Sequence, residues 1–337
     1  MAELVSRRRA IAIIAAFSGL PLVPLKASAN SAIEPVTWSG QALGAPARLV
    51  LHHPDRQFAE KLIGRVVSEI DRLESIFSLY RSHSALNELN RVGGLASPAS
   101  ELVDLLGSCR NVWEASAGAF DPTVQALWSV YARHFSSPVT DNAGPPQDVV
   151  DQGRARVGFD GVRFNRDRIT FTRAGMAMTL NGIAQGYITD RVVDLLRGEG
   201  ITSSLVSMGE SRVIGARPDG APWRIGLATL EDSTDFDSVV GVIDSAVATS
   251  SSLGFHFDEA GRFGHILDPR TGYSAATARR VTVVAPDATM ADAWSTAASI
   301  LSIEEVKAAV ARYPSVTFDI ASRDGSRARF GKPLIDL

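Results

Sequence analysis

The chain of 337 residues has a single cysteine, Cys109, so an intrachain disulfide cannot form. Cys109 lies in an apolar run with helical spacing, and we expect it to be a small core residue rather than a nucleophile. HExxH and CxxC motifs are missing, and no convincing Ser-His-Asp order is present. These absences argue against the familiar zinc, dithiol and serine-triad sites.

An excess of positive charge is also missing, as is an apolar run long enough to span a membrane. The net charge is −3, with 45% hydrophobic and 21% charged residues. This composition is typical of a globular protein with one large domain or two smaller ones. No internal repeat and no shift in composition marks a second domain. The acidic balance argues against nucleic-acid or anionic-membrane partners.

Residues 1–29 have the pattern of an export signal. A basic segment with Arg7 and Arg8 precedes an apolar stretch over 10–24, and Ala29 ends an A-x-A cleavage site. The paired arginines favour the twin-arginine route over an ordinary secretory signal. Cleavage would leave 30 basic against 36 acidic residues in the domain at 30–337. We therefore expect a periplasmic protein without a transmembrane span in the mature chain.

The stretch Thr179–Glu210 is the one around which the chain is organised. Residues 181–187 carry two glycines that allow close approach of the backbone to a ligand. A helix is expected from Ile188, with Gly198 and Gly200 as its stop signals, and a buried strand at 204–208. A glycine loop at a helix N-terminus can hold anionic oxygens, although an ordinary helix–strand connection explains the pattern equally well.

Periodicity predicts further helices and strands on both sides of this stretch. The expected helices are 58–76, 84–89, 102–115, 122–131, 291–301 and 303–313. The expected strands are 162–164, 169–171, 223–227, 239–243, 245–249, 281–285 and 316–322, and residues 37–53 are expected to form a strand or a hairpin.

Few side chains stand out as candidates for chemistry. Asp292 and Thr296 are four residues apart in a predicted helix and would share one face, where two hard oxygens suit Mg²⁺; a role in starting the helix is the alternative. His265 lies in a loop and is either structural or catalytic. Asp268 and Asp121 each precede proline, which is also typical of a tight turn or a helix start. Spacing alone thus suggests an anionic ligand and a Mg²⁺ site.

Five separated stretches together resemble the ApbE family of FAD:protein FMN transferases. They are FSLYRSHSALNELN, GAFDPTVQALW, LNGIAQGYITDRVVDLLRGEGI, VATSSSLGFHF with GHILDPRTGYSA, and ADAWSTA, in the family's order across residues 37 to about 330. The signal peptide, LNGIAQGY and MGE further resemble the NosX branch, which is associated with nitrous oxide respiration.

The resemblance implies an α/β (α+β) fold, as a single domain with a mixed sheet, flanking helices and FAD in a cleft. It implies that the Ala184 carbonyl, Asp292 and Thr296 hold Mg²⁺, and that His265 assists proton transfer from an acceptor hydroxyl. The positions that match the family's FAD-lining residues are Leu43, Tyr80, Ala119, Phe120, Asp121, Asn181, Tyr187 and Ile266.

The resemblance is not complete. Gln185 stands where family members commonly have lysine, and Glu210-Ser211 where a second glycine and an acid are common. The implied reaction is Mg²⁺-dependent transfer of FMN from FAD to a Thr or Ser of an exported flavoprotein, with membrane-bound NosR as a candidate acceptor. FAD hydrolysis to FMN and AMP, and non-enzymatic flavin binding, are the alternatives.

Overall fold

A computed structural model describes residues 34–137, 143–228, 236–251, 254–274, 278–322 and 325–336. The expected signal peptide at 1–29 lies outside these residues. No helix within them is long and apolar enough to cross a membrane.

Helices and strands come largely in separate runs along the chain, as in other α+β proteins. The helices are α2 (Arg56–Phe77), α3 (Ala85–Val92), α4 (Ser100–Ala115), α5 (Gln125–Ser136), α6 (Gln147–Arg154), α7 (Ala184–Gly198), α8 (Ala288–Ala298) and α9 (Ile303–Arg312), with short 3₁₀ turns η1 (Pro122–Val124) and η2 (Phe159–Gly161). The strands are β1 (Val36–Ala42), β2 (Ala45–Leu51), β3 (Gly94–Ala96), β4 (Val162–Phe164), β5 (Arg168–Phe171), β6 (Ser204–Met208), β7 (Ser211–Ile214), β8 (Trp223–Ala228), β9 (Phe236–Val242), β10 (Ala246–Ser251), β11 (Ala278–Ala285), β12 (Thr317–Ser322), β13 (Arg327–Phe330) and β14 (Ile335–Asp336).

The main sheet contains eight strands in the order β1-β2-β6-β7-β10-β11-β12-β13. Its pairings are antiparallel throughout the described residues, which corrects the expectation of a mixed sheet. Tight reversals such as β6–β7 and short connections such as β1–β2 account for this, because antiparallel neighbours need no crossover helix. The α+β class with flanking helices is confirmed.

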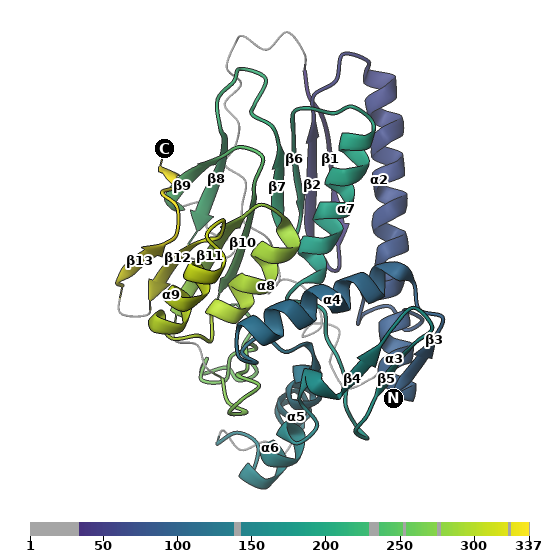
Figure 1. Cartoon of the computed structure of the whole chain (residues 1–337), viewed down its shortest axis with the longest axis vertical. Coiled ribbons are helices and arrows are strands. Elements are labelled where there is room, and N and C mark those ends of the chain that lie inside the picture. The colour runs from purple at the N-terminus through teal and green to yellow at the C-terminus, as the bar shows by residue number, and fades with distance from the viewer. Residues whose placement is uncertain are drawn as a thin grey trace.

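Alternation along the central strands sends side chains to two cores. Leu49 and Leu51 of β2 belong to the large core under helices α2, α4, α7 and α8, whereas Val50 between them belongs to a second core. The second core is closed by the small sheet β14-β9-β8, which contributes Trp223 and Ile225. Figure 1 shows this arrangement, with the helices on one side of the main sheet and β8–β9 on the other. Side chains of a strand alternate between faces, so both faces of these central strands are buried.

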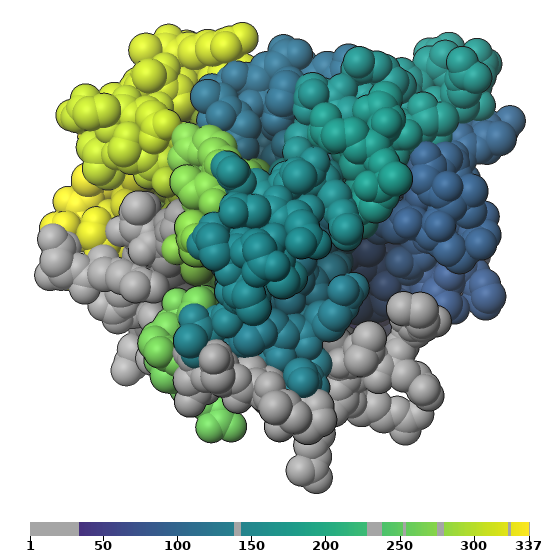
Figure 2. Space-filling view, turned by 90° about the horizontal axis from the view of Figure 1, so that it is seen from below, coloured from purple at the N-terminus to yellow at the C-terminus, as the bar shows by residue number. Residues whose placement is uncertain are grey.

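A third cluster of apolar residues lies at the end of the molecule below the sheet in Figure 1. It joins α5 and α6 to the segment after β10 through Tyr131, Phe135, Val150, Phe257 and Leu267. From below, the teal residues around α6 and the light-green segment after β10 lie side by side in Figure 2. This packing fixes the loop that carries His265.

The elements predicted from periodicity are largely present, with two kinds of difference. Helix α7 begins at Ala184, so Gly186 lies inside the helix rather than in a loop before it. Helix α8 also begins earlier than predicted, at Ala288, with Asp287 as its N-cap. Strands β3, β7, β13 and β14 and helix α6 were not predicted, because each is too short to give a clear periodic pattern.

Candidate functional site

The candidate site lies where the start of α7 meets α8. The N–H of Gly186 donates to Oδ2 of Asp292 over 3.0 Å. A Cβ at Gly186 would lie 2.2 Å from the Ala288 carbonyl oxygen, so only glycine permits this approach of the two helices. A Cβ at Gly182 would similarly lie 2.8 Å from Oγ1 of Thr296. The glycines singled out in the sequence therefore serve close packing of the two helices.

The structure brings the three expected metal ligands to this contact. Ala184, buried at the first turn of α7, lies between the glycines that touch Thr296 and Asp292. Asp292 is 3% exposed, and Thr296 follows one turn later on α8. Oγ1 of Thr296 lies 3.5 Å from the hydroxyl of Ser250 on β10. Two helix segments and one strand thus place these oxygens.

Asp190 holds α8 in position against α7. Its carboxylate accepts hydrogen bonds from the N–H groups of Ala288 and Thr289, each over 2.8 Å, at the first turn of α8. Arg212 on β7 pairs with the same carboxylate at 2.6 Å. A carboxylate at a helix N-terminus satisfies backbone donors that would otherwise lack partners. Asp190 therefore positions the helix that carries Asp292.

A second carboxyl group, that of Glu210, belongs to the same site, although the sequence alone gives it no role there. Glu210 follows β6, is 6% exposed, and accepts a hydrogen bond at Oε2 from the N–H of Thr249 on β10 over 3.2 Å. Burial and the neighbouring charge of Asp292 raise the pKa of Glu210 well above its usual range. The sequence shows Glu210 as an acidic residue in a glycine turn after a buried strand, at a position that departs from the common family pattern.

The pKa of Asp292 is likewise raised, to about 7, mainly because the group is buried. The Gly186 N–H opposes this shift, and the charge of Asp190 adds to it. Among the described residues, neither Asp292 nor Glu210 forms an ion pair with arginine, lysine or histidine. Two buried carboxyl groups without a cationic partner are costly unless they bind protons or a metal ion.

This donor set suits Mg²⁺, which prefers carboxylate, hydroxyl and carbonyl oxygens and keeps waters or substrate oxygens as further ligands. No cluster of three or more His, Cys, Asp or Glu side chains occurs in the part of the chain that the structure describes. A site built from one or two carboxylates with neutral oxygens is compatible with that observation. The residues present therefore fit the metal that the sequence led us to expect.

Three of the expected flavin-lining residues lie near the start of α7. The amide nitrogen of Asn181 donates to the hydroxyl of Tyr80 over 3.3 Å, although 101 residues separate them. Tyr187 packs edge-to-face on Phe77, with ring centroids 5.4 Å apart. Tyr80 is 41% exposed, which leaves an aromatic face accessible to a planar ligand. Aromatic and amide groups thus gather at the start of α7, where Gly182 and Gly186 contact α8.

Leu43 lies in the turn between β1 and β2 with a φ of 49°, in the left-handed region. Its N–H donates to the carboxylate of Glu74 on α2, which holds this turn. Ile266, next to His265, is half-buried against the large core.

Both carboxylate oxygens of Asp121 accept hydrogen bonds that hold the local backbone. Its Oδ1 accepts hydrogen bonds from the N–H and hydroxyl of Thr123, and its Oδ2 accepts one from the N–H of Phe159. It caps η1, as the helix-start interpretation of the sequence had proposed. Ala119 and Phe120 before it are buried, so this segment has few side-chain groups left for a ligand.

His265 is held in one tautomer by the loop. Its Nδ1 lies 2.8 Å from the carbonyl oxygen of Phe255, and its backbone N–H donates to the same oxygen. Nδ1 therefore carries the proton, which leaves the lone pair on Nε2. Burial lowers the pKa of His265 to about 4, so the ring is neutral at pH 7.

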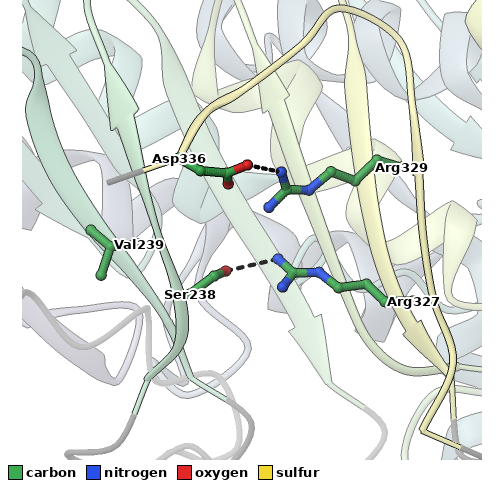
Figure 3. A pocket seen from close by; sticks show the side chains of 5 residues that line it. All are labelled: Ser238, Val239, Arg327, Arg329 and Asp336. Carbon is green, nitrogen blue, oxygen red and sulfur yellow. Dashed lines mark hydrogen bonds and ion pairs between the residues drawn. The ribbon is translucent and has the colours of Figure 1, made fainter.

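A separate pocket of about 410 Å³ lies beside the small sheet, and Figure 3 shows its lining. Arg327 donates to the hydroxyl of Ser238 over 2.7 Å, and Arg329 pairs with Asp336 at 2.6 Å. Both arginines also bind the buried carboxylate of Asp319. None of the expected site residues lines this pocket, so it is not the expected flavin cleft.

Comparison with known proteins shows which family has this architecture. The model of the ApbE family matches residues 43–318. The FAD:protein FMN transferase of Escherichia coli K12 is 27% identical over 317 residues, which cover 90% of this chain and 89% of that protein. That of Treponema pallidum is 29% identical over 272 residues, with 74% of each chain covered.

Solved structures give the same result. The crystal structure of the ApbE protein from Thermotoga maritima superposes with a TM-score of 0.76 at 26% identity, covering 88% of this chain and 96% of that one. The apo flavinyl transferase ApbE of Pseudomonas stutzeri has a TM-score of 0.74 at 24% identity, covering 88% and 95%, a likeness of fold. The family match spans most of the described residues, and on this basis the chain belongs to the ApbE family.

Proposed function

We propose that the chain is an FAD:protein FMN transferase that uses Mg²⁺. The observation that carries the proposal is the pair of buried carboxyl groups, Asp292 and Glu210, which have no cationic partner among the described residues. The segment that carries Asn181 contacts Thr296 of the same site through Gly182. Family membership and relatives named for this activity support it. The chain is thus an enzyme of flavin transfer, with FAD as its substrate.

Asp292, Thr296 and the carbonyl of Ala184 would hold the metal. A bound Mg²⁺ supplies positive charge that offsets the charge of the FAD pyrophosphate. The aromatic ring of Tyr80 and the amide of Asn181 would orient the flavin part of the substrate. Positioning and electrostatic stabilisation are the main contributions of a protein to reactions at phosphorus.

His265 would act on the acceptor. The oxygen of a Thr or Ser hydroxyl forms a bond to the FMN phosphorus, and the bond from that phosphorus to the bridging oxygen breaks. AMP leaves with the bridging oxygen, and the hydroxyl proton passes to Nε2 of His265. The contact of Nδ1 with the Phe255 carbonyl supports this role, because it orients the lone pair of Nε2.

The cellular setting is part of the proposal. The arginine pair and A-x-A site at residues 1–29 support export to the periplasm by the twin-arginine route. The acceptor would then be an exported flavoprotein, and the resemblance to the NosX branch favours one that serves nitrous oxide respiration, such as membrane-bound NosR. Replacing Arg7 and Arg8 with lysine should leave a folded precursor in the cytoplasm.

The test is to follow AMP release from FAD with and without Mg²⁺, and with and without a candidate acceptor. A transferase releases AMP only when both are present. AMP release that needs Mg²⁺ but not the acceptor would show a pyrophosphatase instead. Retention of FAD without AMP release under all conditions would indicate a flavin-binding accessory protein.

A further inference from the structure

Glu210 lies beside the proposed metal ligands, although it comes from another part of the chain. The strand β10 links them: the N–H of Thr249 binds the Glu210 carboxylate, and the hydroxyl of the next residue, Ser250, lies 2.8 Å from that of Ser295 and 3.5 Å from that of Thr296. Consecutive residues of one strand thus contact Glu210 and the ligand helix α8.

The start of α7 makes a second link. The hydroxyl of Thr189 lies 2.9 Å from the Gln185 carbonyl and 3.0 Å from the Glu210 carbonyl. The Gln185 side chain lies against the backbone of Gly209, where a Cβ would be 2.5 Å from its Cδ. The next residue, Gly186, donates to Asp292. A neutral amide therefore lies beside the turn that carries Glu210, and it adds no positive charge.

We propose that Glu210 is a second acidic residue of the divalent-cation site, and that it acts with Asp292 to set the affinity for Mg²⁺. The inference rests on the proposed metal site and names a residue that the expected ligand set lacks. Only one hydrogen bond to the Glu210 carboxylate is present among the described residues, on Oε2. A carboxylate in a site shielded from water strengthens cation binding far more than one at the surface.

The test measures metal binding directly, apart from catalysis. Binding of Mn²⁺ to the mature chain, alone and with FAD bound, is followed by electron paramagnetic resonance, and Mg²⁺ is added as a competitor. Glu210→Gln keeps the size and the acceptor for the Thr249 N–H but removes the charge. We expect its Kd for Mn²⁺ to rise about tenfold or more. Glu210→Asp, which keeps the charge, should recover most of the affinity.

Two further variants separate the possible failures. Asp292→Asn should also weaken Mn²⁺ binding; if it does and Glu210→Gln binds as wild type does, the role of Glu210 is wrong while the metal site stands. If Asp292→Asn has wild-type affinity, or if wild type binds no Mn²⁺, the proposed metal site fails and Glu210 with it. Should Glu210→Gln not fold, Glu210→Ala is measured in its place, because it also removes the carboxylate. Its Kd for Mn²⁺ should rise in the same way, and a wild-type Kd would overturn the inference.

Discussion

Gly186 of α7 and Asp292 of α8 are joined by a hydrogen bond from the glycine N–H to the carboxylate, across a contact too close for any side chain at position 186. The donor belongs to the first turn of α7, where backbone N–H groups have no partner within the helix. The start of one helix therefore holds the acidic residue of the other. The site depends on how closely the two helices approach.

Gly186→Ala should separate the helices. Its Cβ would overlap the Ala288 carbonyl, which cannot move aside as a side chain can, and we expect a loss of at least ~2 kcal/mol in unfolding free energy together with loss of FMN transfer. Urea denaturation and the transfer assay measure both effects.

Gly198→Ala is the matched control, because a Cβ there meets no atom within 4 Å and the residue ends the same helix. Its stability should stay within about 1 kcal/mol of wild type, on the stabilising side. Equal effects of the two substitutions would contradict the close-packing role of Gly186.

Asp190→Ala should destabilise the protein by about 3 kcal/mol, because it leaves Arg212 without its partner and removes the acceptor of the Ala288 and Thr289 N–H groups. Asp194→Ala, on the same helix, removes an exposed partner of Arg191 and should cost less than ~1 kcal/mol. The comparison uses urea denaturation of both variants. Similar costs would show that Asp190 does not hold α8.

The pH dependence of transfer should reflect the low pKa of His265. A base acts in its neutral form, which predominates above its pKa of about 4, so the wild-type rate should show no His265 step near pH 6.5 in single-turnover experiments at saturating FAD. His265→Gln should lower this rate about 10²–10⁴-fold and change FAD affinity little. A wild-type rate in that variant would end the catalytic role, and a loss explained by weaker FAD binding would indicate a structural one.

Titration by NMR checks the cause of the low pKa. The His265 resonance, assigned with the His265→Gln variant, should titrate near pH 4 in the free protein. Bound FAD should move its pKa upward, because phosphate charge favours the protonated ring. A free-protein pKa near 6.5 would show that burial does not control this group.

Features that depend on neighbouring residues can be predicted from the sequence, whereas features that depend on contacts between distant segments cannot. Strand β6 was predicted with its observed bounds, because Ser204 to Met208 form a continuous buried strand. Gly186 was interpreted as a loop residue, since glycine gives the same local signal in a loop and at a close helix contact. The contact with α8 decides between a loop and a close helix contact, and the residues that make it, Gly186 and Asp292, are 106 residues apart in the sequence.

The same reasoning applies to charge. Asp292 could be proposed because Thr296 follows at helical spacing, whereas the place of Glu210 beside it depends on strand β10 and the order of the sheet. The tautomer and lowered pKa of His265 depend on Phe255 and on the aromatic cluster that holds its loop. These features arise only when distant segments pack together.

The most direct measurement weighs the acceptor. The mature chain is incubated with FAD, Mg²⁺ and a candidate flavoprotein domain, and the intact mass of that domain is measured by mass spectrometry. We predict a gain equal to FMN less one water, with equimolar AMP, and no gain when Asp292→Asn replaces wild type. An unchanged acceptor mass while AMP and free FMN accumulate would contradict the transferase account.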